Sequence, residues 1–171
     1  MASYTALTLH ATGDDFAVTD YNAVANNTTF LYQTPYALIY QTVSTSVPET
    51  TGTQVSLGGV SAMNYGWSVG SNNLVVPLTG IYNVIGTITM QTATGSPKCF
   101  AFIYHNGTET LQGSTGVFDS AVNTVTNANG LVSCTAGDTL GLWVYQTAAG
   151  PLATVTGSSN TYLHAFFVGS Q

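Results

Sequence analysis

Apolar and polar residues alternate in short stretches from residue 36 onward, and clusters of glycine, asparagine, serine and proline separate these stretches. Alternation with a period of two indicates β-strands, and regularly spaced turn residues are typical of antiparallel sandwiches. The pattern therefore predicts an all-β sandwich of about eight to ten antiparallel strands. Eleven stretches are candidates for these strands, namely residues 36–45, 53–57, 66–69, 73–76, 80–92, 98–105, 116–125, 130–134, 138–146, 153–156 and 161–168.

Residues 19–32 follow a different period, because several of their side chains recur at three- and four-residue intervals. A threonine and an aspartate at the start of this segment can cap the first helical turn. Pro35 then disfavours helical backbone at the residue before it. The sequence predicts one short helix over residues 19–32, which needs another surface beside it because such a helix is marginal in water.

Several of the predicted strands are apolar on both faces, among them residues 98–105 and 161–168. A strand with one face in water alternates polar with apolar residues, so the second face needs a cover that the sandwich core does not provide. A partner subunit is the natural cover, since tyrosine and phenylalanine are enriched at protein interfaces. The side chains predicted to meet a neighbouring subunit are Tyr82, Phe100, Phe102, Tyr104, Tyr162, His164 and Phe166.

Charged residues are scarce. The 171 residues include one basic and seven acidic side chains, which give a formal net charge of -6 at pH 7. Nucleic acids and anionic membranes bind clustered lysine and arginine, so neither is expected as a partner. The N-terminal residues have no cationic flank or long apolar stretch, so we expect synthesis in the cytoplasm without a secretory signal or membrane anchor.

The sequence offers little support for catalysis. His10, His105 and His164 are spread along the chain, and Asp119 follows His105 by fourteen residues with serines nearby. Neither a GxSxG nucleophile turn nor an HExxH helix is present. We therefore expect no enzymatic activity and no cofactor.

Metal binding is also not expected. Asp14, Asp15 and Asp20 offer carboxylates, but their spacing does not match a calcium loop, and the dipole of the helix explains an acidic start. Cys99 and Cys134 belong to no CxxC pair or zinc-type cluster. We expect both thiols to be buried, and a disulfide between them is the alternative.

Four motifs in the second half of the chain follow one another in a familiar order. Residues 78–86 contain G-x-Y-x-V, residues 102–107 end in an Asn-Gly turn, residues 136–142 read A-G-D-x-L-x-L, and residues 162–169 form an aromatic closing strand. Together they resemble the tumour-necrosis-factor-like (TNF-like) and complement-type jelly rolls. The resemblance implies a TNF-like jelly-roll sandwich that forms a homotrimer, with its closing strands around a threefold axis.

The first half of the chain resembles the start of bacteriophage virion proteins that carry this jelly roll. In those proteins a short polar helix, here within residues 15–27, leads into the first strand. The resemblance implies an N-terminal attachment arm over residues 1–35 and a jelly-roll domain over residues 36–171. The arm side chains expected to bind a capsid are Phe16, Tyr21, Val24, Phe30 and Leu31.

These resemblances predict a non-enzymatic structural protein on the outer surface of a virion. The first hypothesis is a trimeric capsid decoration, or cement, protein whose partners are its own copies and the major capsid protein. The alternative is a receptor-binding module of a tail or head-fibre tip that recognises a host surface glycan. Trp67 and Trp143, with the tyrosines and neighbouring amide residues, are the candidates for stacking on sugars, although packing explains most aromatic residues more simply.

Overall fold

The computed structural model describes residues 18–32 and 34–170. Contacts within the chain divide it into two compact units, Met1–Pro35 and Tyr36–Gln171. The described part of the first unit is the helix α1 (Val18–Tyr32) and the short segment that follows it. The predicted helix is therefore confirmed, and it begins one residue before the expected start.

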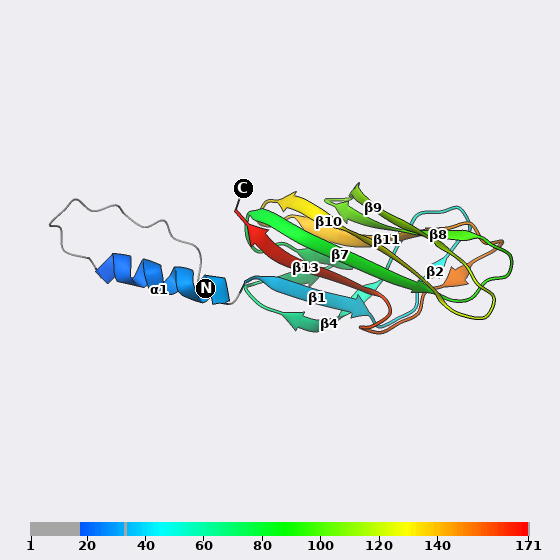
Figure 1. Cartoon of the computed structure of the whole chain (residues 1–171), viewed down its shortest axis with the longest axis horizontal. Helices are drawn as coiled ribbons and strands as arrows, with labels where there is room; N and C mark the ends of the chain where they lie inside the picture. The colour runs from blue at the N-terminus through cyan, green and yellow to red at the C-terminus, as the bar shows by residue number, and fades with distance from the viewer. Residues whose placement is uncertain (1–17, 33, 171) are drawn as a thin grey trace. The chain divides into compact units, whose positions relative to one another are not determined.

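The second unit contains a five-stranded antiparallel sheet, named here the β13 sheet after its central strand. Its strands are apolar on the side that faces the core, and they lie next to one another as one layer in Figure 1. In spatial order they are β10 (Thr124–Cys134), β7 (Gly80–Met90), β13 (Tyr162–Gly169), β1 (Tyr36–Gln41) and β4 (Leu57–Met63).

A second antiparallel sheet, named here the β8 sheet, packs against the first. In spatial order its strands are β5 (Ser68–Gly70), β6 (Asn73–Val75), β11 (Thr139–Gln146), β8 (Lys98–His105) and β9 (Thr108–Val117), and β3 (Thr53–Gln54) also pairs with β11. A small separate ladder joins β12 (Leu152–Ala153) to β2 (Ser46–Val47). The predicted all-β sandwich is confirmed.

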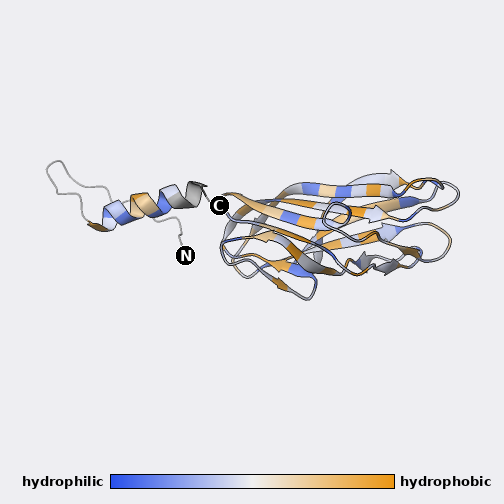
Figure 2. Ribbon diagram, turned by 90° about the horizontal axis from the view of Figure 1, so that it is seen from below, coloured by the Kyte–Doolittle hydropathy of each residue, from blue (hydrophilic) through white to orange (hydrophobic). Residues whose placement is uncertain are grey.

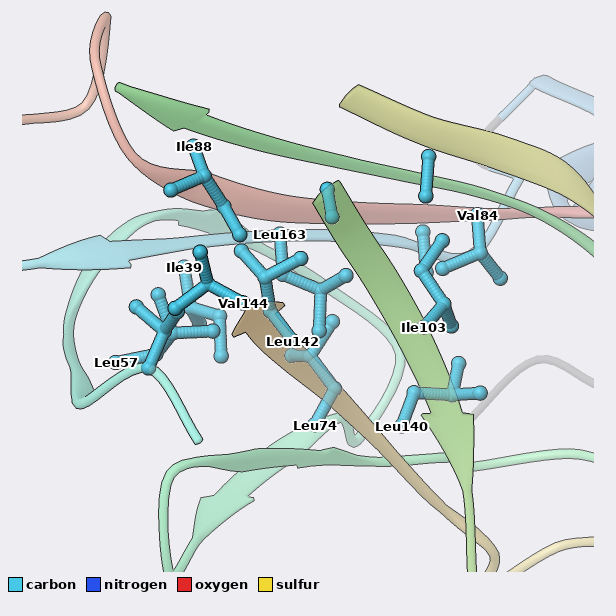
Figure 3. Packing of buried hydrophobic residues seen from close by; sticks show 14 of the residues in the cluster. Ile39, Leu57, Leu74, Val84, Ile88, Ile103, Leu140, Leu142, Val144 and Leu163 are labelled. Atoms are coloured by element: carbon cyan, nitrogen blue, oxygen red, sulfur yellow. The ribbon is translucent and has the colours of Figure 1, made fainter. Parts of the chain in front are cut away.

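The core lies between the two sheets, where aliphatic side chains from both interdigitate (Figure 3). Hydrophobic and hydrophilic residues alternate along the long strands, as Figure 2 shows, and this alternation places the apolar side chains on the core side of each sheet. Gly86 in β7 is needed for this packing, because a Cβ atom there would collide with the Leu142 side chain from the opposite sheet. The labelled core residues are Ile39, Leu57, Leu74, Val84, Ile88, Ile103, Leu140, Leu142, Val144 and Leu163.

Several strand boundaries differ from the sequence prediction, and two of these differences have a clear physical reason. The stretch 116–125 was expected to be one strand, but it contains the end of β9, a connection and the start of β10. Most of β9 is polar and exposed, so an edge strand of this kind carries no apolar alternation by which it could be found. The prediction also ended a strand at residue 57, where β4 begins. Glycines there suggest a turn, but Gly59 instead leaves room for the Tyr40 ring on the adjacent strand.

Candidate functional site

The outward side of the β13 sheet carries apolar side chains. In β13, Tyr162, His164 and Phe166 point away from the core because they alternate with the fully buried Leu163 and Ala165. The registers with neighbouring strands extend this surface sideways across β10, β7 and β1. Its members, named here the β13 face, are Tyr36, Leu38, Tyr40, Ile85, Leu131, Tyr162, His164 and Phe166.

Strand pairing places the β13 face in continuous rows. One row joins Ile85, His164 and Leu38, and a second joins Leu131, through Asn83, to Phe166 and Tyr36. Leu131 is 62% exposed and Tyr36 is 40% exposed, although both are large and apolar. A contiguous surface of this kind is typical of a protein contact, because isolated soluble domains expose few large apolar patches.

His164 lies at the centre of these rows. Its ring lies 5.5 Å from the ring of Phe166, measured between centroids. Burial lowers the pKa of His164, because the charged imidazolium is poorly solvated there. The neutral imidazole is therefore favoured, which suits an apolar surface.

Tyr82 is removed from the predicted interface by its position in the structure. It is fully buried, and its ring meets those of Trp67 and Phe167 edge-on at centroid distances of 5.3 and 5.4 Å. Its hydroxyl donates a hydrogen bond to the carbonyl oxygen of Leu78 at 2.7 Å, and burial raises its pKa to about 12. Tyr82 is a core residue, and Trp67, which is 5% exposed, is likewise unavailable to a ligand.

Phe100, Phe102 and Tyr104 also lie away from the β13 face, because β8 belongs to the opposite sheet. They point outward from the sandwich together with Trp143 and Tyr145 of β11, which the interface prediction did not include. The seven residues predicted for one interface therefore divide between the core and two opposite outer faces. The five aromatic residues of β8 and β11 are named here the aromatic strip.

A polar cluster lies where β8 ends and β11 begins. The Asp138 carboxylate accepts hydrogen bonds from the Asn106 side chain at 2.8 Å and from the backbone N–H of Thr135 at 2.7 Å. His105 Nε2 lies 2.8 Å from the same carboxylate. These contacts, with the Asn106 hydrogen bond the largest, lower the pKa of Asp138 to about 2. The cluster joins two turns that are separated by about thirty positions along the chain.

The same cluster offers a possible metal-ligand set. Atoms of His105, Cys134 and Asp138 that can bind metal all lie within 4.8 Å of one another. However, burial raises the pKa of the Cys134 thiol to about 11, and the Asp138 oxygens already accept the hydrogen bonds described above. Zinc requires a thiolate and accessible lone pairs. We therefore interpret the cluster as a set of hydrogen bonds that holds the two turns together.

The structure describes the side chains of only two of the five residues that were predicted to bind a capsid. Tyr21 and Val24 are exposed on α1, whereas Phe16 and the side chains of Phe30 and Leu31 lie outside the described residues. The predicted attachment role of all five stays a prediction. His10, Asp14 and Asp15 also lie outside the described residues.

Cys99 and Cys134 are both buried thiols rather than a disulfide, as the first of the two readings predicted. Within the described ranges, no helix combines the length and the apolar character that a membrane crossing requires.

Comparison with known proteins identifies the fold. No family model matches the chain, and no curated protein is similar to it in sequence. Among solved structures, murine APRIL at pH 5.0 is 14% identical with a TM-score of 0.61, over 79% of this chain and 99% of that chain. The Eiger TNF from S. frugiperda is 13% identical with a TM-score of 0.60, over 81% of this chain and 95% of that chain. The second unit is therefore a TNF-like jelly roll, as the four motifs predicted.

Proposed function

We propose that this TNF-like jelly roll is a structural protein of a phage particle, and that three copies associate through the β13 face to decorate the outer surface of the capsid. The proposal needs two contacts, one between copies and one with the major capsid protein. The role of the protein is mechanical, because opening the shell would also require these contacts to be broken.

The observation that carries the proposal is the β13 face. It presents Leu131, Tyr36 and their neighbours on the outside of a sandwich whose own core is already complete. The desolvated His164 at its centre adds no charge to the surface at neutral pH. A stable interface between copies buries on the order of 1,000 Å² or more, and the β13 face would supply this contact. A cyclic trimer is the assembly that the resemblance to TNF-like proteins implies.

Contact with the capsid is assigned to the residues before Tyr36. Three exposed apolar side chains of α1, Val18, Tyr21 and Val24, recur every three positions and so lie along adjoining turns of the helix. Each arm alone would bind weakly. Three arms on one trimer bind with higher avidity, because the second and third attachments become intramolecular.

A reconstitution experiment tests this function. Phage particles from which the protein has been stripped are incubated with the purified full-length chain, and the temperature at which the shell releases DNA is measured. We expect the wild-type chain to raise that temperature, and a Tyr21→Ser, Val24→Ser double variant to bind less. No rise with a wild-type chain that folds normally would contradict the decoration role.

Receptor binding at a tail or fibre tip is the second candidate, and the aromatic strip favours it because partly exposed rings on an outer sheet face suit sugar ligands. The copy number of the protein in purified particles separates the two. Decoration of a capsid lattice requires many copies, whereas a tail tip carries only a few.

A further inference from the structure

Beyond association of copies and attachment to a capsid, we propose that the aromatic strip is a binding site for a neutral glycan. The strip consists of Phe100, Phe102, Tyr104, Trp143 and Tyr145 on the outer face of the β8 sheet. It lies on the sheet opposite the β13 face, so it stays accessible when copies associate through that face. The proposal therefore does not depend on the trimer.

The composition of the strip differs from that of the β13 face. Between Lys98 and Tyr104 the outward positions of β8 are all aromatic, and the outward positions of β11 after Gly141 are Trp143 and Tyr145. Aliphatic residues occur on the β13 face but not at these positions. Pyranose rings present C–H groups that pack on the electron-rich faces of aromatic rings. Aliphatic side chains offer no such face.

The rings of the strip hold one another in place. Tyr104 and Trp143 stack with their centroids 4.6 Å apart and their planes at 20°. The ring centroid of Phe100 lies 6.4 Å from that of Phe102 and 6.1 Å from that of Tyr145. Rings fixed in this way lose little side-chain entropy when a ligand binds, which favours affinity for a ligand as weakly held as a sugar.

Two amide side chains border the stacked pair. Asn73, the first residue of β6, is in register with Gly141 and its side chain lies over that glycine, and its Oδ1 accepts a hydrogen bond from Gln54 Nε2 at 2.9 Å. Gln54 is in register with Trp143. This bond leaves the Asn73 Nδ2 donors and the Gln54 Oε1 acceptor without a hydrogen-bond partner among the described residues. Paired donors and acceptors beside aromatic rings match the hydroxyl groups of a sugar.

The charges around the strip favour a neutral ligand. Lys98 lies beyond Phe100 at one end of β8, and Glu109 pairs with Tyr104 at the other end. The cross-strand neighbours between these ends, Gln112 and Thr115, carry amide and hydroxyl groups. An acidic glycan would find a single lysine and a carboxylate, so electrostatic complementarity is poor.

Fluorescence titration of the full-length chain tests the site. Trp143 is partly exposed on the outer face of the β8 sheet while Trp67 is buried in the core, so a change in tryptophan emission reports on the strip. The probes are maltohexaose, cellohexaose and chitohexaose as neutral glycans, with a heparin hexasaccharide as the acidic contrast. We expect saturable binding of at least one neutral probe and weaker binding of heparin.

Variants on both sheets make the test specific. Tyr104→Ala and Gln54→Met are each expected to weaken binding about tenfold, measured by calorimetry with thermal melting to verify the fold. Leu131→Asp, on the β13 face, is the matched control and is expected to bind as the wild type does, even if it prevents trimer formation. The proposal is overturned if no neutral probe binds, if binding survives both strip variants, or if Tyr104→Ala changes the sedimenting mass, which would place a second copy on the strip.

Discussion

Asp138 connects two turns through its carboxylate, which accepts hydrogen bonds from Asn106, Thr135 and His105. Replacement by alanine leaves these donors without their acceptor. We expect Asp138→Ala to lower the free energy of unfolding by about 2 kcal/mol, measured by urea denaturation. Glu109→Ala is the matched control, because Glu109 is an exposed acidic residue and its loss is expected to change stability by about 0.5 kcal/mol or less. Equal effects of the two variants would contradict a stabilising role of the Asp138 hydrogen bonds.

The lowered pKa of Asp138 also gives a pH dependence with a definite sign. In the unfolded chain the carboxyl group titrates near 3.8, whereas in the folded chain its pKa is about 2. The stabilisation is complete above pH 3.8 and is lost as pH falls toward 2, because the unfolded chain takes up the proton first. The difference in unfolding free energy between wild type and Asp138→Asn should therefore shrink over this range. A constant difference down to pH 2 would contradict the assignment.

His164 gives a second pH dependence in a different range. Its pKa in the folded chain lies below the ordinary value of 6.5, because burial disfavours the imidazolium. As pH falls below 6.5, the unfolded chain binds the proton and the free energy of unfolding decreases. We expect His164→Phe to reduce this decrease, measured by chemical denaturation between pH 7.5 and 5. The same slope in both proteins would show that His164 is not desolvated.

At the scale of strands, β8 and β13 are both apolar on two faces, but only β13 belongs to the proposed subunit contact. We expect Phe166→Asp to dissociate the trimer, since it places a carboxylate in the β13 face. Phe102→Asp makes the same change on the aromatic strip and is expected to leave the trimer intact. Light scattering of the two purified variants compares them. Dissociation by Phe102→Asp, with a trimer retained in Phe166→Asp, would reverse the assignment of the sheets.

The order and pattern of the strands could be read from the sequence because burial alternates with a period of two. The two-sided apolar pattern of residues 98–105 and 161–168 correctly indicated that each has an outward apolar face. It could not indicate that β8 and β13 lie in opposite sheets, because sheet membership depends on pairing between distant strands. The predicted interface does not include Tyr36 or the other outward side chains of β1, although the strand itself is predicted and the same two-sided pattern is present there.

At the candidate site, contacts between residues that are distant in sequence limit what the sequence can predict. His105 was compared with Asp119, which is closer in sequence, but the structure pairs it with Asp138 across the sheet edge. The position of Tyr82 was also missed. An aromatic residue in an alternating strand faces either the core or the outside, and only its neighbours in space decide which.

At the scale of the whole molecule, the sandwich has two chemically different outer faces. The β13 face mixes aliphatic and aromatic side chains and suits a second protein surface. The aromatic strip combines rings with amides and suits a sugar. A small charge count is consistent with both uses, because neither face depends on salt-sensitive attraction.

Sedimentation equilibrium of the full-length chain at neutral pH tests whether three copies associate through the β13 face. We expect one species with three times the 17.8 kDa mass of the chain, which Leu131→Asp converts to single subunits that remain folded. A wild-type chain that stays monomeric at micromolar concentration, with its β13 face in water, would contradict this association.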